Sequence, residues 1–296
     1  MNAIHSNHSY GSSAFIRTRD GRKLHYMSKG SGNPIVVFES GMGFSRSAWG
    51  LVVPQVAEHT QSVVYDRSGL GRSEADTEQR SLRRLAEDLG DLLTALGPGP
   101  FILVGHSWGG PIVRAAAAGD LSRIRGLILV DPSDENCELY FSTMAKTSFA
   151  VNRFLLPLMA RTGLYRKMGS KPGQVQPDDV AQDHQEEDFT VQAARTMAAE
   201  SVTFLDDLAS LRHTPPELGN LEVSIISGTK AGKGEQKIRP AIVSAHRKTV
   251  QRLANGQWIE AGQSGHMVTF TDPQIIIDEI LRMANDSGLG ASLGQK

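Results

Sequence analysis

The residues best suited to chemistry lie in the segment Gly105-His106-Ser107-Trp108-Gly109. It matches the pattern G-x-S-x-G and stands between the apolar run 101–104 and a helical pattern. Glycines on both sides let the backbone pass close to itself in a sharp strand-to-helix turn. Such a turn exposes the serine hydroxyl and directs the positive end of the helix dipole at a reacting carbonyl group. We therefore predict that Ser107 is a nucleophile; an ordinary glycine-rich turn is the alternative.

A serine hydroxyl attacks a carbonyl group only when a base takes its proton, and the chain has nine histidines to choose from. His266 lies in the loop 262–266, after the last strand-like run 257–261 and before the final helical pattern. Loops at the carboxyl ends of strands are where an α/β sheet places its ligand chemistry. The other histidines lie near the N-terminus, beside Ser107, or in strand, helix and insert patterns. These positions are more typical of surface or structural histidines. His266 is the predicted base.

Composition and charge exclude several classes of protein. Lys and Arg number 31 and Asp and Glu 32, for a net charge of -1, so we expect neither a nucleic-acid nor a membrane partner. A single cysteine, Cys137, excludes a disulfide framework and a cysteine-built metal site. The chain has no long apolar run, and its first 14 residues lack the pattern of a secretory signal. We expect a cytoplasmic protein.

Two further patterns bear on cofactor binding and charge. The segment 228–234 resembles a phosphate-binding loop, but its spacing is one residue short and Gly234 stands where a Ser or Thr would bind magnesium. No spacing typical of metal ligands is present, so neither a cofactor nor a metal is predicted. The acidic cluster 183–188 is predicted to be a solvated helix face.

The elements that must position Ser107 and His266 alternate between strands and helices. Short apolar, β-branched runs occupy 35–38, 62–65, 101–104, 127–130 and 223–226, preceded by a hairpin pattern over 14–18 and 22–28. Helical patterns cover 46–59, 82–96, 109–119, 236–254 and 273–284. This rhythm predicts an α/β fold whose mostly parallel sheet carries helices on both faces.

Composition also suggests domain boundaries. The stretch 134–215 has no β-branched run and is rich in Leu, Met and Phe, so it is predicted to be a helical insertion. The sheet-forming core then comprises 14–133 and 216–285. Residues 1–13 are predicted to be a flexible leader and 286–296 a flexible tail.

The chain resembles the α/β-hydrolase superfamily over roughly 15–284. Besides the serine and histidine segments, 65–73 (YDRSGLGRS) is similar to a D-x-x-G-x-G-x-S segment of that superfamily. The resemblance implies an eight-stranded sheet, a helical cap inserted after strand six, and the chain order serine, acid, histidine. Serine at the nucleophile position differs from the dehalogenase and epoxide-hydrolase branches, which use aspartate there.

The acid departs from the usual pattern of the superfamily. Members usually carry it after strand seven, but here 227–234 has no carboxylate and Glu235 is the first. Some members hold the acid at the end of strand six, where this chain has Asp131. A carboxylate anchored there could orient the imidazole, so Asp131 is the predicted acid. Alternatives are a turn-capping role for Asp131, the carboxylates of Asp134 or Glu235, or no functional acid.

The loop after strand three also departs from the superfamily, because it reads Glu39-Ser40-Gly41-Met42-Gly43 rather than His-Gly. An oxyanion hole needs only backbone N–H groups, so the side-chain change does not abolish it. By position the donors would be Met42 and Trp108. Glu39 would either pair with a cation such as Arg67 or face solvent.

These residues predict a metal-independent serine hydrolase. It would cleave a carboxylic ester or lactone, an apolar small molecule, through a Ser-His-Asp triad and an acyl-enzyme intermediate. The alternative is a non-hydrolytic ligand-binding or receptor protein on the same scaffold, with an inactive triad.

Overall fold

The computed structural model describes residues 8–285 and contains one eight-stranded sheet. The strand order is β1-β2-β4-β3-β5-β6-β7-β8. Strands β1 and β2 form an antiparallel hairpin, β2 pairs with β4 antiparallel, and every later pairing is parallel. The strands are β1 (Ser12–Arg17), β2 (Lys23–Lys29), β3 (Ile35–Glu39), β4 (Ser62–Tyr65), β5 (Phe101–His106), β6 (Ile124–Val130), β7 (Glu222–Gly228) and β8 (Gly256–Ala261).

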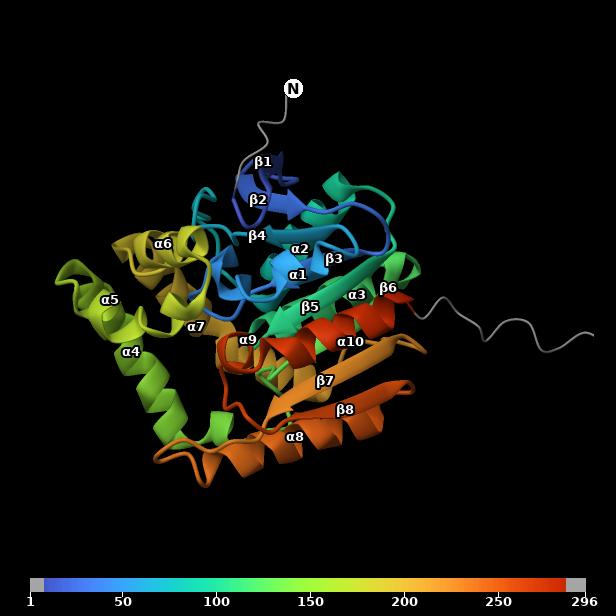
Figure 1. Ribbon diagram of the computed structural model, residues 1–296. Coiled ribbons are helices and arrows are strands. Elements are labelled where there is room, and N and C mark those ends of the chain that lie inside the picture. The colour runs from blue at the N-terminus through green and yellow to red at the C-terminus, as the bar shows by residue number, and fades with distance from the viewer. Residues whose placement is uncertain (1–7, 286–296) are drawn as a thin grey trace, which may run out of the picture.

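Helices cover both faces of the sheet, as the alternating patterns predicted (Figure 1). One apolar core lies between the sheet and α2 (Leu82–Leu96) and α3 (Gly109–Gly119). The other lies beneath α1 (Val53–Val56) and α10 (Pro273–Asn285). Every residue of β3 and β5 is buried, because a strand with helices on both sides has no face left for solvent. Helix α8 (Ile238–Arg252) packs on β7 and β8, and α9 (Val268–Thr271) precedes α10.

Between β6 and β7 the chain forms only helical elements, in the stretch predicted to be a helical insertion. They are η3 (Glu138–Phe141), α4 (Thr143–Arg161), α5 (Leu164–Gly169), η4 (Pro172–Val175), α6 (Asp178–Glu187) and α7 (Val191–His213). In Figure 1 these helices lie at the side toward which the arrowheads of β5 and β7 point. They therefore lie over the edge of the sheet at which the parallel strands end. We refer to 134–215 as the insert.

Two predictions about local structure are wrong. The single helix expected over 46–59 is a 3-10 turn, η1 (Arg46–Trp49), followed by the short α1, because Gly50 ends the first and Pro54 lacks the N–H needed to continue it. Part of the leader expected over 1–13 is ordered: Tyr10 is fully buried, its hydroxyl donates to the carbonyl of Arg46, and β1 begins at Ser12. Residues 1–7 and the predicted tail 286–296 lie outside the described residues.

The remaining helical bounds agree with the predicted ones to within two residues for α2, α3, α8 and α10. Helix α2 begins after Ser81, whose hydroxyl accepts a hydrogen bond from the N–H of Arg84, and it ends at Gly97. Across the described residues, no helix is long and apolar enough to cross a membrane.

Candidate active site

Ser107 lies on the sharp turn between β5 and α3, with a positive φ of 53°. A side chain at either flanking glycine would collide with backbone: a Cβ on Gly105 would lie 2.5 Å from the carbonyl oxygen of Gly109, and one on Gly109 2.4 Å from that of Glu39. The two glycines are therefore required by the close approach of the chain. The turn holds Ser107 in a conformation that non-glycine residues rarely adopt.

Asp131 follows the neighbouring strand and is placed in register with Ser107. The last paired residues of β5 and β6 are His106 and Val130, so Ser107 and Asp131 each come one residue later. The N–H of Ser107 donates to the carbonyl of Val130 at 3.0 Å, and that of Asp131 to the carbonyl of Ile226 at 2.7 Å. Asp131 also has a positive φ, 41°. Parallel strands bring both residues to one edge of the sheet.

His266 lies between these two residues and contacts both. Its Nε2 is 3.1 Å from the Ser107 hydroxyl oxygen, and its Nδ1 is 2.6 Å from Oδ2 of Asp131. The imidazole is 42% exposed, whereas the carboxylate of Asp131 is fully buried. The structure thus brings together the three residues that the sequence singled out, with the imidazole open to an incoming molecule. In this arrangement the imidazole can take a proton from the hydroxyl while the carboxylate fixes its tautomer.

The surroundings of Asp131 keep its carboxylate charged. Burial alone would raise the pKa of Asp131, but the hydrogen bond from His266 and the charges of His266, His246 and Arg239 lower it to about 2. Arg239 donates to Oδ2 at 2.7 Å, and the N–H of Gly228 donates to Oδ1 at 3.1 Å. These partners also fix the orientation of the carboxylate.

The alternative acids point elsewhere. Oδ2 of Asp134 accepts a hydrogen bond from the hydroxyl of Thr249 at 2.6 Å, and Oε2 of Glu235 accepts one from the N–H of Gly232 at 2.9 Å. Within the described residues, neither carboxylate forms a hydrogen bond or an ion pair with His266. Of the three carboxylates that the sequence offered, Asp131 is the one in contact with the imidazole.

His106, the residue before Ser107, supports the loop that carries His266. Its Nε2 is 3.0 Å from the backbone carbonyl oxygen of His266, and because a carbonyl only accepts, this nitrogen carries the proton. Burial and the neighbouring charge of His266 lower the pKa of His106 to about 4. His106 is therefore neutral at pH 7 and fixes the backbone of the loop.

The loop after β3 is held from behind by the buried guanidinium of Arg67. Two of its N–H groups donate to the carbonyls of Ser40 at 2.6 Å and Gly41 at 2.9 Å. A third reaches Glu39 at 2.5 Å, and the last two bind the carboxylate of Glu200 on α7, each at 3.0 Å. All five N–H donors of the guanidinium are thus used. Of the two sequence-based alternatives for Glu39, the structure shows the pairing with Arg67.

The hydrogen bond from Arg67 to the carbonyl of Gly41 determines the orientation of the peptide group between Gly41 and Met42. The carbonyl of Gly41 and the N–H of Met42 belong to one trans peptide unit and point in opposite directions. Because Arg67 holds the carbonyl, the N–H of Met42 is directed to the other side. Gly41 also lies close to the nucleophile: a Cβ there would be 3.2 Å from the Cβ of Ser107.

A cavity of about 240 Å³ opens beside Ser107 and His266. Its apolar lining comes from both parts of the chain, namely Met42 and Phe44 from the sheet side and Tyr140, Phe149, Met197 and Phe204 from the insert. Trp108 also borders the cavity, and its ring packs edge-on against Phe204 at 4.8 Å between centroids. The site is therefore a small apolar chamber between the sheet edge and the insert.

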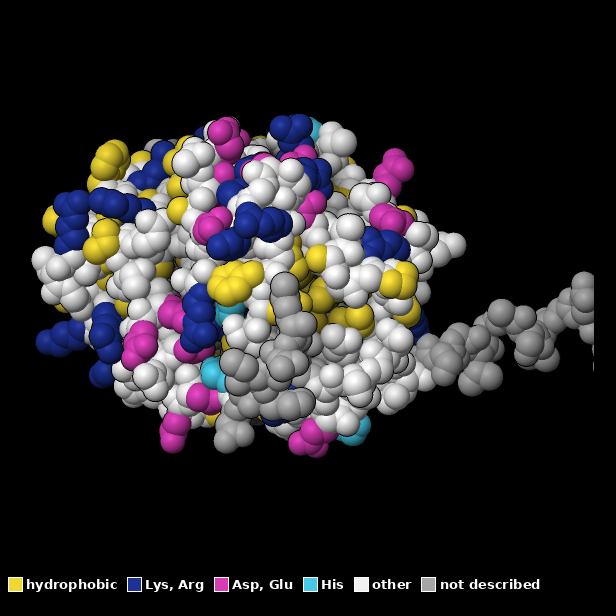
Figure 2. Space-filling view, turned by 90° about the horizontal axis from the view of Figure 1, so that it is seen from above, with side chains coloured by type: hydrophobic (Ala, Val, Ile, Leu, Met, Phe, Trp, Pro, Cys, Tyr) yellow, Lys and Arg dark blue, Asp and Glu magenta, His cyan; other side chains and the backbone are white. Residues whose placement is uncertain are grey.

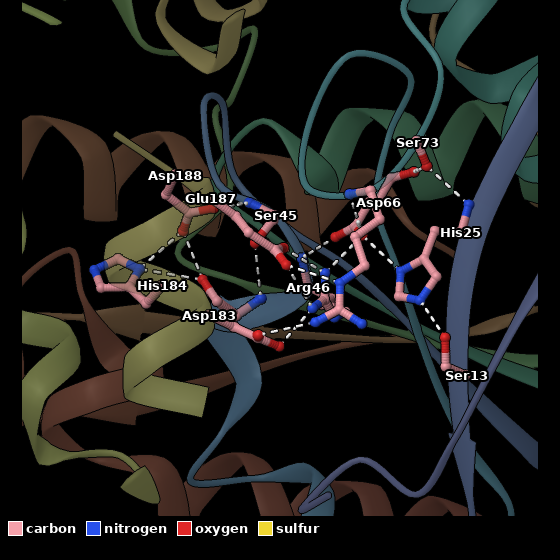
Figure 3. A network of polar contacts seen from close by, with 12 residues as sticks. Ser13, His25, Ser45, Arg46, Asp66, Ser73, Asp183, His184, Glu187 and Asp188 are labelled. Atoms are coloured by element: carbon pink, nitrogen blue, oxygen red, sulfur yellow. Dashed lines mark hydrogen bonds and ion pairs between the residues drawn. The ribbon is translucent and has the colours of Figure 1, made fainter. Parts of the chain in front are cut away.

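A second polar network joins the insert to the sheet (Figure 3). Arg46 lies at its centre and forms ion pairs with Asp66 at 2.7 Å, Asp183 at 2.5 Å and Glu187 at 2.6 Å. The prediction that 183–188 is a solvated face is wrong, because Asp183, His184 and Asp188 are buried. Burial would raise the pKa of Asp183, but His8, Arg46 and Arg72 lower it to about 2. The buried cation of Arg46 thus offsets the unfavourable burial of Asp66 and Asp183.

The same network contains Ser13, His25 and Asp66 in hydrogen-bonded sequence, at 2.8 Å for each contact. Asp66 is already engaged by Arg46 and by the backbone N–H groups of Arg46 and Arg72. Ser13 lies on the regular strand β1 rather than on a turn before a helix. These residues tie β1 to the loop after β4, a structural role of the kind expected for a histidine in a strand pattern.

No sequence pattern indicated Arg239 or His246, which support Asp131 and its neighbours. Arg239 is one of several cations in α8, and His246 contacts the hydroxyl of Ser227 at 2.8 Å and the carbonyl of Pro132 at 2.8 Å. Both are buried on α8, where the helical pattern alone does not distinguish a buried cation from an exposed one. In the described residues, no group of three or more His, Cys, Asp or Glu side chains could hold a metal ion.

Comparison with known proteins agrees with this fold. A sequence profile of the Alpha/beta hydrolase family matches residues 36–279, and the chain therefore belongs to that family. It is 24% identical over 266 residues to the uncharacterized protein YqjL of Bacillus subtilis (strain 168), covering 88% of this chain and 87% of the relative. It is 31% identical over 112 residues to a soluble epoxide hydrolase of Corynebacterium sp. (strain C12), covering 38% of this chain and 39% of the relative.

Solved structures share the fold over nearly the whole chain. The epoxide hydrolase CorEH superimposes with a TM-score of 0.72 at 21% identity, covering 92% of this chain and 98% of that one. The esterase EaEST from Exiguobacterium antarcticum gives a TM-score of 0.73 at 18% identity, with the same coverage of 92% and 98%.

Proposed function

We propose that this protein is a serine hydrolase that cleaves a small carboxylic ester or lactone without a metal ion. The observation that carries the proposal is the contact of His266 with both Ser107 and Asp131, at 3.1 Å and 2.6 Å. The family and the names of the relatives support hydrolysis in general, and some of those relatives are named as epoxide hydrolases. Serine at the turn favours an acyl substrate, because a hydroxyl activated by a base attacks carbonyl carbon.

The proposed reaction has two halves. In the first, the Ser107 oxygen attacks the carbonyl carbon while His266 Nε2 takes the hydroxyl proton. The tetrahedral intermediate collapses, His266 returns that proton to the leaving alcohol oxygen, and the acyl group stays on Ser107. In the second, water attacks the acyl carbon while His266 takes a proton from the water. The bond from the acyl carbon to the Ser107 oxygen then breaks, His266 returns the proton to that oxygen, and the carboxylic acid is released.

The negative oxygen of each tetrahedral intermediate is stabilised by backbone N–H groups of Met42 and Trp108. Both residues border the cavity beside Ser107. Arg67 acts through this loop: it holds the carbonyl of Gly41 at 2.9 Å and so orients the N–H of Met42. Arg67 is a positioning residue, because it does not itself line the cavity.

The cavity supports a preference for small substrates. Its volume of about 240 Å³ is below the roughly 300–1,000 Å³ of pockets that hold drug-sized ligands. Its apolar lining suits a short acyl chain. The alternative of a ligand-binding protein with an inactive triad rests on the lack of a carboxylate after β7. The contact of His266 with Asp131, the residue after β6, weighs against that alternative, because Asp131 can serve as the acid.

The test is a series of p-nitrophenyl esters of increasing acyl length, assayed with the wild type and with Ser107→Ala, in the presence and absence of EDTA. We expect turnover of the short esters, a decline with chain length, no effect of EDTA, and no turnover by Ser107→Ala. Equal turnover by the variant would place the chemistry elsewhere. Loss of activity in EDTA, restored by a divalent cation, would contradict a metal-independent reaction.

A further inference from the structure

The outer face of α4 and α5 exposes large apolar side chains. Phe154 is 83% exposed, Met144 80% and Met168 66%, and no residue of either helix is buried. The other exposed apolar residues of this part of the insert are Val151, Leu155, Leu158, Leu164 and Val175. Single exposed apolar residues are common on protein surfaces, but so many in adjoining helices mark an interaction surface. We call these eight residues the α4–α5 face.

Four of the five exposed apolar residues of α4 follow the helical period. At about 100° per residue, Met144, Val151, Leu155 and Leu158 fall within one stripe about 60° wide. The opposite side of the same helix carries Phe149, which lines the cavity beside Ser107. Helix α4 therefore has two apolar sides, one that lines the cavity beside Ser107 and one that is open to solvent.

The charge of this segment is entirely positive. Residues 143–177 contain six basic side chains and no acidic one: Lys146, Arg153, Arg161, Arg166, Lys167 and Lys171. All but Arg153 are exposed. Within residues 8–285 none of the six takes part in an ion pair, although other cations of the insert such as Arg212 do. At the left edge of Figure 2, on the side where Figure 1 shows α4 and α5, yellow and dark blue side chains lie side by side, and magenta ones lie further in.

We propose that the α4–α5 face docks the protein on a lipid bilayer surface that carries anionic headgroups. Exposed Phe, Leu and Met beside Lys and Arg are the composition of helices that lie in a membrane interface, where apolar side chains enter the acyl boundary and cations meet the headgroups. The described helices are too short or too polar to cross the bilayer, so the protein would lie on it. The net charge of -1 describes the whole chain, whereas residues 143–177 carry six cations and no acidic residue. The balanced total charge therefore does not argue against membrane binding by this segment.

A second copy of this chain fits the face less well. A twofold interface sets the same surface against itself, so the cations of Arg166, Lys167 and Lys171 would face one another, and residues 143–177 supply no carboxylate to separate them. Like charges brought together in this way are repelled. An anionic lipid surface supplies the missing negative charge.

The test is co-sedimentation of the full chain with vesicles of phosphatidylcholine alone and of phosphatidylcholine mixed with phosphatidylglycerol, at low ionic strength. We expect binding to the mixed vesicles, weak binding to phosphatidylcholine, and release near 1 M salt, where the screening length is about 3 Å. Failure of the wild type to bind the mixed vesicles would overturn the proposal.

Variants separate the two components of the surface. Replacing three cations in Arg166→Gln/Lys167→Gln/Lys171→Gln is expected to weaken binding by about 100-fold, since each basic residue near an anionic surface contributes about a fivefold gain. Phe154→Ser/Met168→Ser is expected to reduce binding at every salt concentration at which the wild type binds. The matched control removes three exposed cations from α2 and α8, in Arg83→Gln/Lys248→Gln/Arg252→Gln, and should bind as the wild type does. An equal loss in the control would contradict a specific face.

Two further measurements separate membrane docking from self-association and from catalysis. Sedimentation velocity without vesicles gives the oligomeric state; a dimer that the substitutions in the α4–α5 face convert to monomer, with no vesicle binding, would assign the face to a second copy instead. Ser107→Ala should bind vesicles as tightly as the wild type. If the proposed hydrolase activity were absent, the vesicle-binding result would still stand. If vesicle binding were absent, the proposed hydrolase activity would still stand.

Discussion

Ser107 and Asp131 occupy equivalent positions at the ends of two neighbouring parallel strands, one residue beyond the paired His106 and Val130. They are also the two non-glycine residues of the described chain with positive φ, 53° and 41°. Unfavourable backbone conformations persist where the surrounding structure enforces them, and they concentrate at functional sites. The same sheet edge thus holds the proposed nucleophile and the proposed acid in fixed orientations.

Asp131→Asn is expected to lower kcat by up to about 10⁴-fold, because the amide cannot set the imidazole tautomer or stabilise its charge. Asparagine also tolerates a positive φ, so the backbone at 131 should be retained. Asp134→Asn and Glu235→Gln are the matched controls and should keep most of their activity. Steady-state kinetics on a short p-nitrophenyl ester provides the measurement. Comparable losses in Glu235→Gln would move the acid to Glu235.

Backbone strain at Ser107 predicts that glycine is more stable than alanine at this position. Glycine adopts a φ of 53° without the steric cost that a Cβ imposes, whereas alanine keeps that cost. Ser107→Gly is expected to be more stable than Ser107→Ala by about 1 kcal/mol, and both variants should be inactive. Urea unfolding of the two variants gives the comparison. An alanine variant as stable as the glycine variant would mean that the turn is not strained.

Arg67→Lys should impair the proposed oxyanion hole, because it alters the support of the loop after β3. An ammonium group has three N–H donors against the five that the guanidinium uses here, so some contacts to Ser40, Gly41, Glu39 and Glu200 are lost. We expect kcat to fall by about 10²–10³-fold, the usual effect of losing an oxyanion donor, with little change in KM.

Arg80→Lys is the control for this substitution. Arg80 also binds the carboxylate of Glu200, at 3.0 Å, but its hydrogen bonds do not include the carbonyls of Ser40 or Gly41. It should keep most of kcat while disturbing the same buried cluster. If both variants lost kcat equally, Arg67 would act on the stability of the cluster rather than on the loop.

The buried His106 should make stability depend on pH. Its pKa is lowered from 6.5 to about 4 in the folded chain, so the unfolded chain binds a proton that the folded chain does not. The free energy of unfolding is then highest above about pH 6.5 and falls by up to about 3 kcal/mol as the pH decreases toward 4. Urea unfolding of the wild type and of His106→Phe between pH 7 and pH 4 measures this. The same pH dependence in both proteins would show that another group is responsible.

Much of this arrangement could be predicted from the sequence, for identifiable reasons. The continuous β-branched runs located the buried strands, and the glycines around Ser107 revealed the turn because close backbone approach leaves no room for a Cβ. The position of Asp131 at the end of a strand pointed to its place beside His266. Local patterns carry this kind of information, since each depends on residues adjacent in the chain.

Other contacts between segments that are distant in the chain could not be predicted from the sequence. Asp183 and Glu187 resemble a solvated face because α6 carries no Lys or Arg that could pair with them; their partner Arg46 lies 137 residues earlier than Asp183. Tyr10 resembles part of a leader because the carbonyl that its hydroxyl binds, that of Arg46, lies 36 residues later in the chain. The exposure of the α4–α5 face could not be predicted either, because its Leu, Met and Phe content resembles that of an insert core. The fold shows that those side chains are exposed.

Ser107 as a nucleophile activated by His266 can be tested by treating the protein with a fluorophosphonate and locating the adduct by peptide mass spectrometry. The wild type should be labelled on Ser107, and Ser107→Ala should stay unlabelled. His266→Ala should react far more slowly, because the hydroxyl lacks its base. A wild type that remains unlabelled, or a label on another serine that persists in Ser107→Ala, would contradict this assignment of the nucleophile.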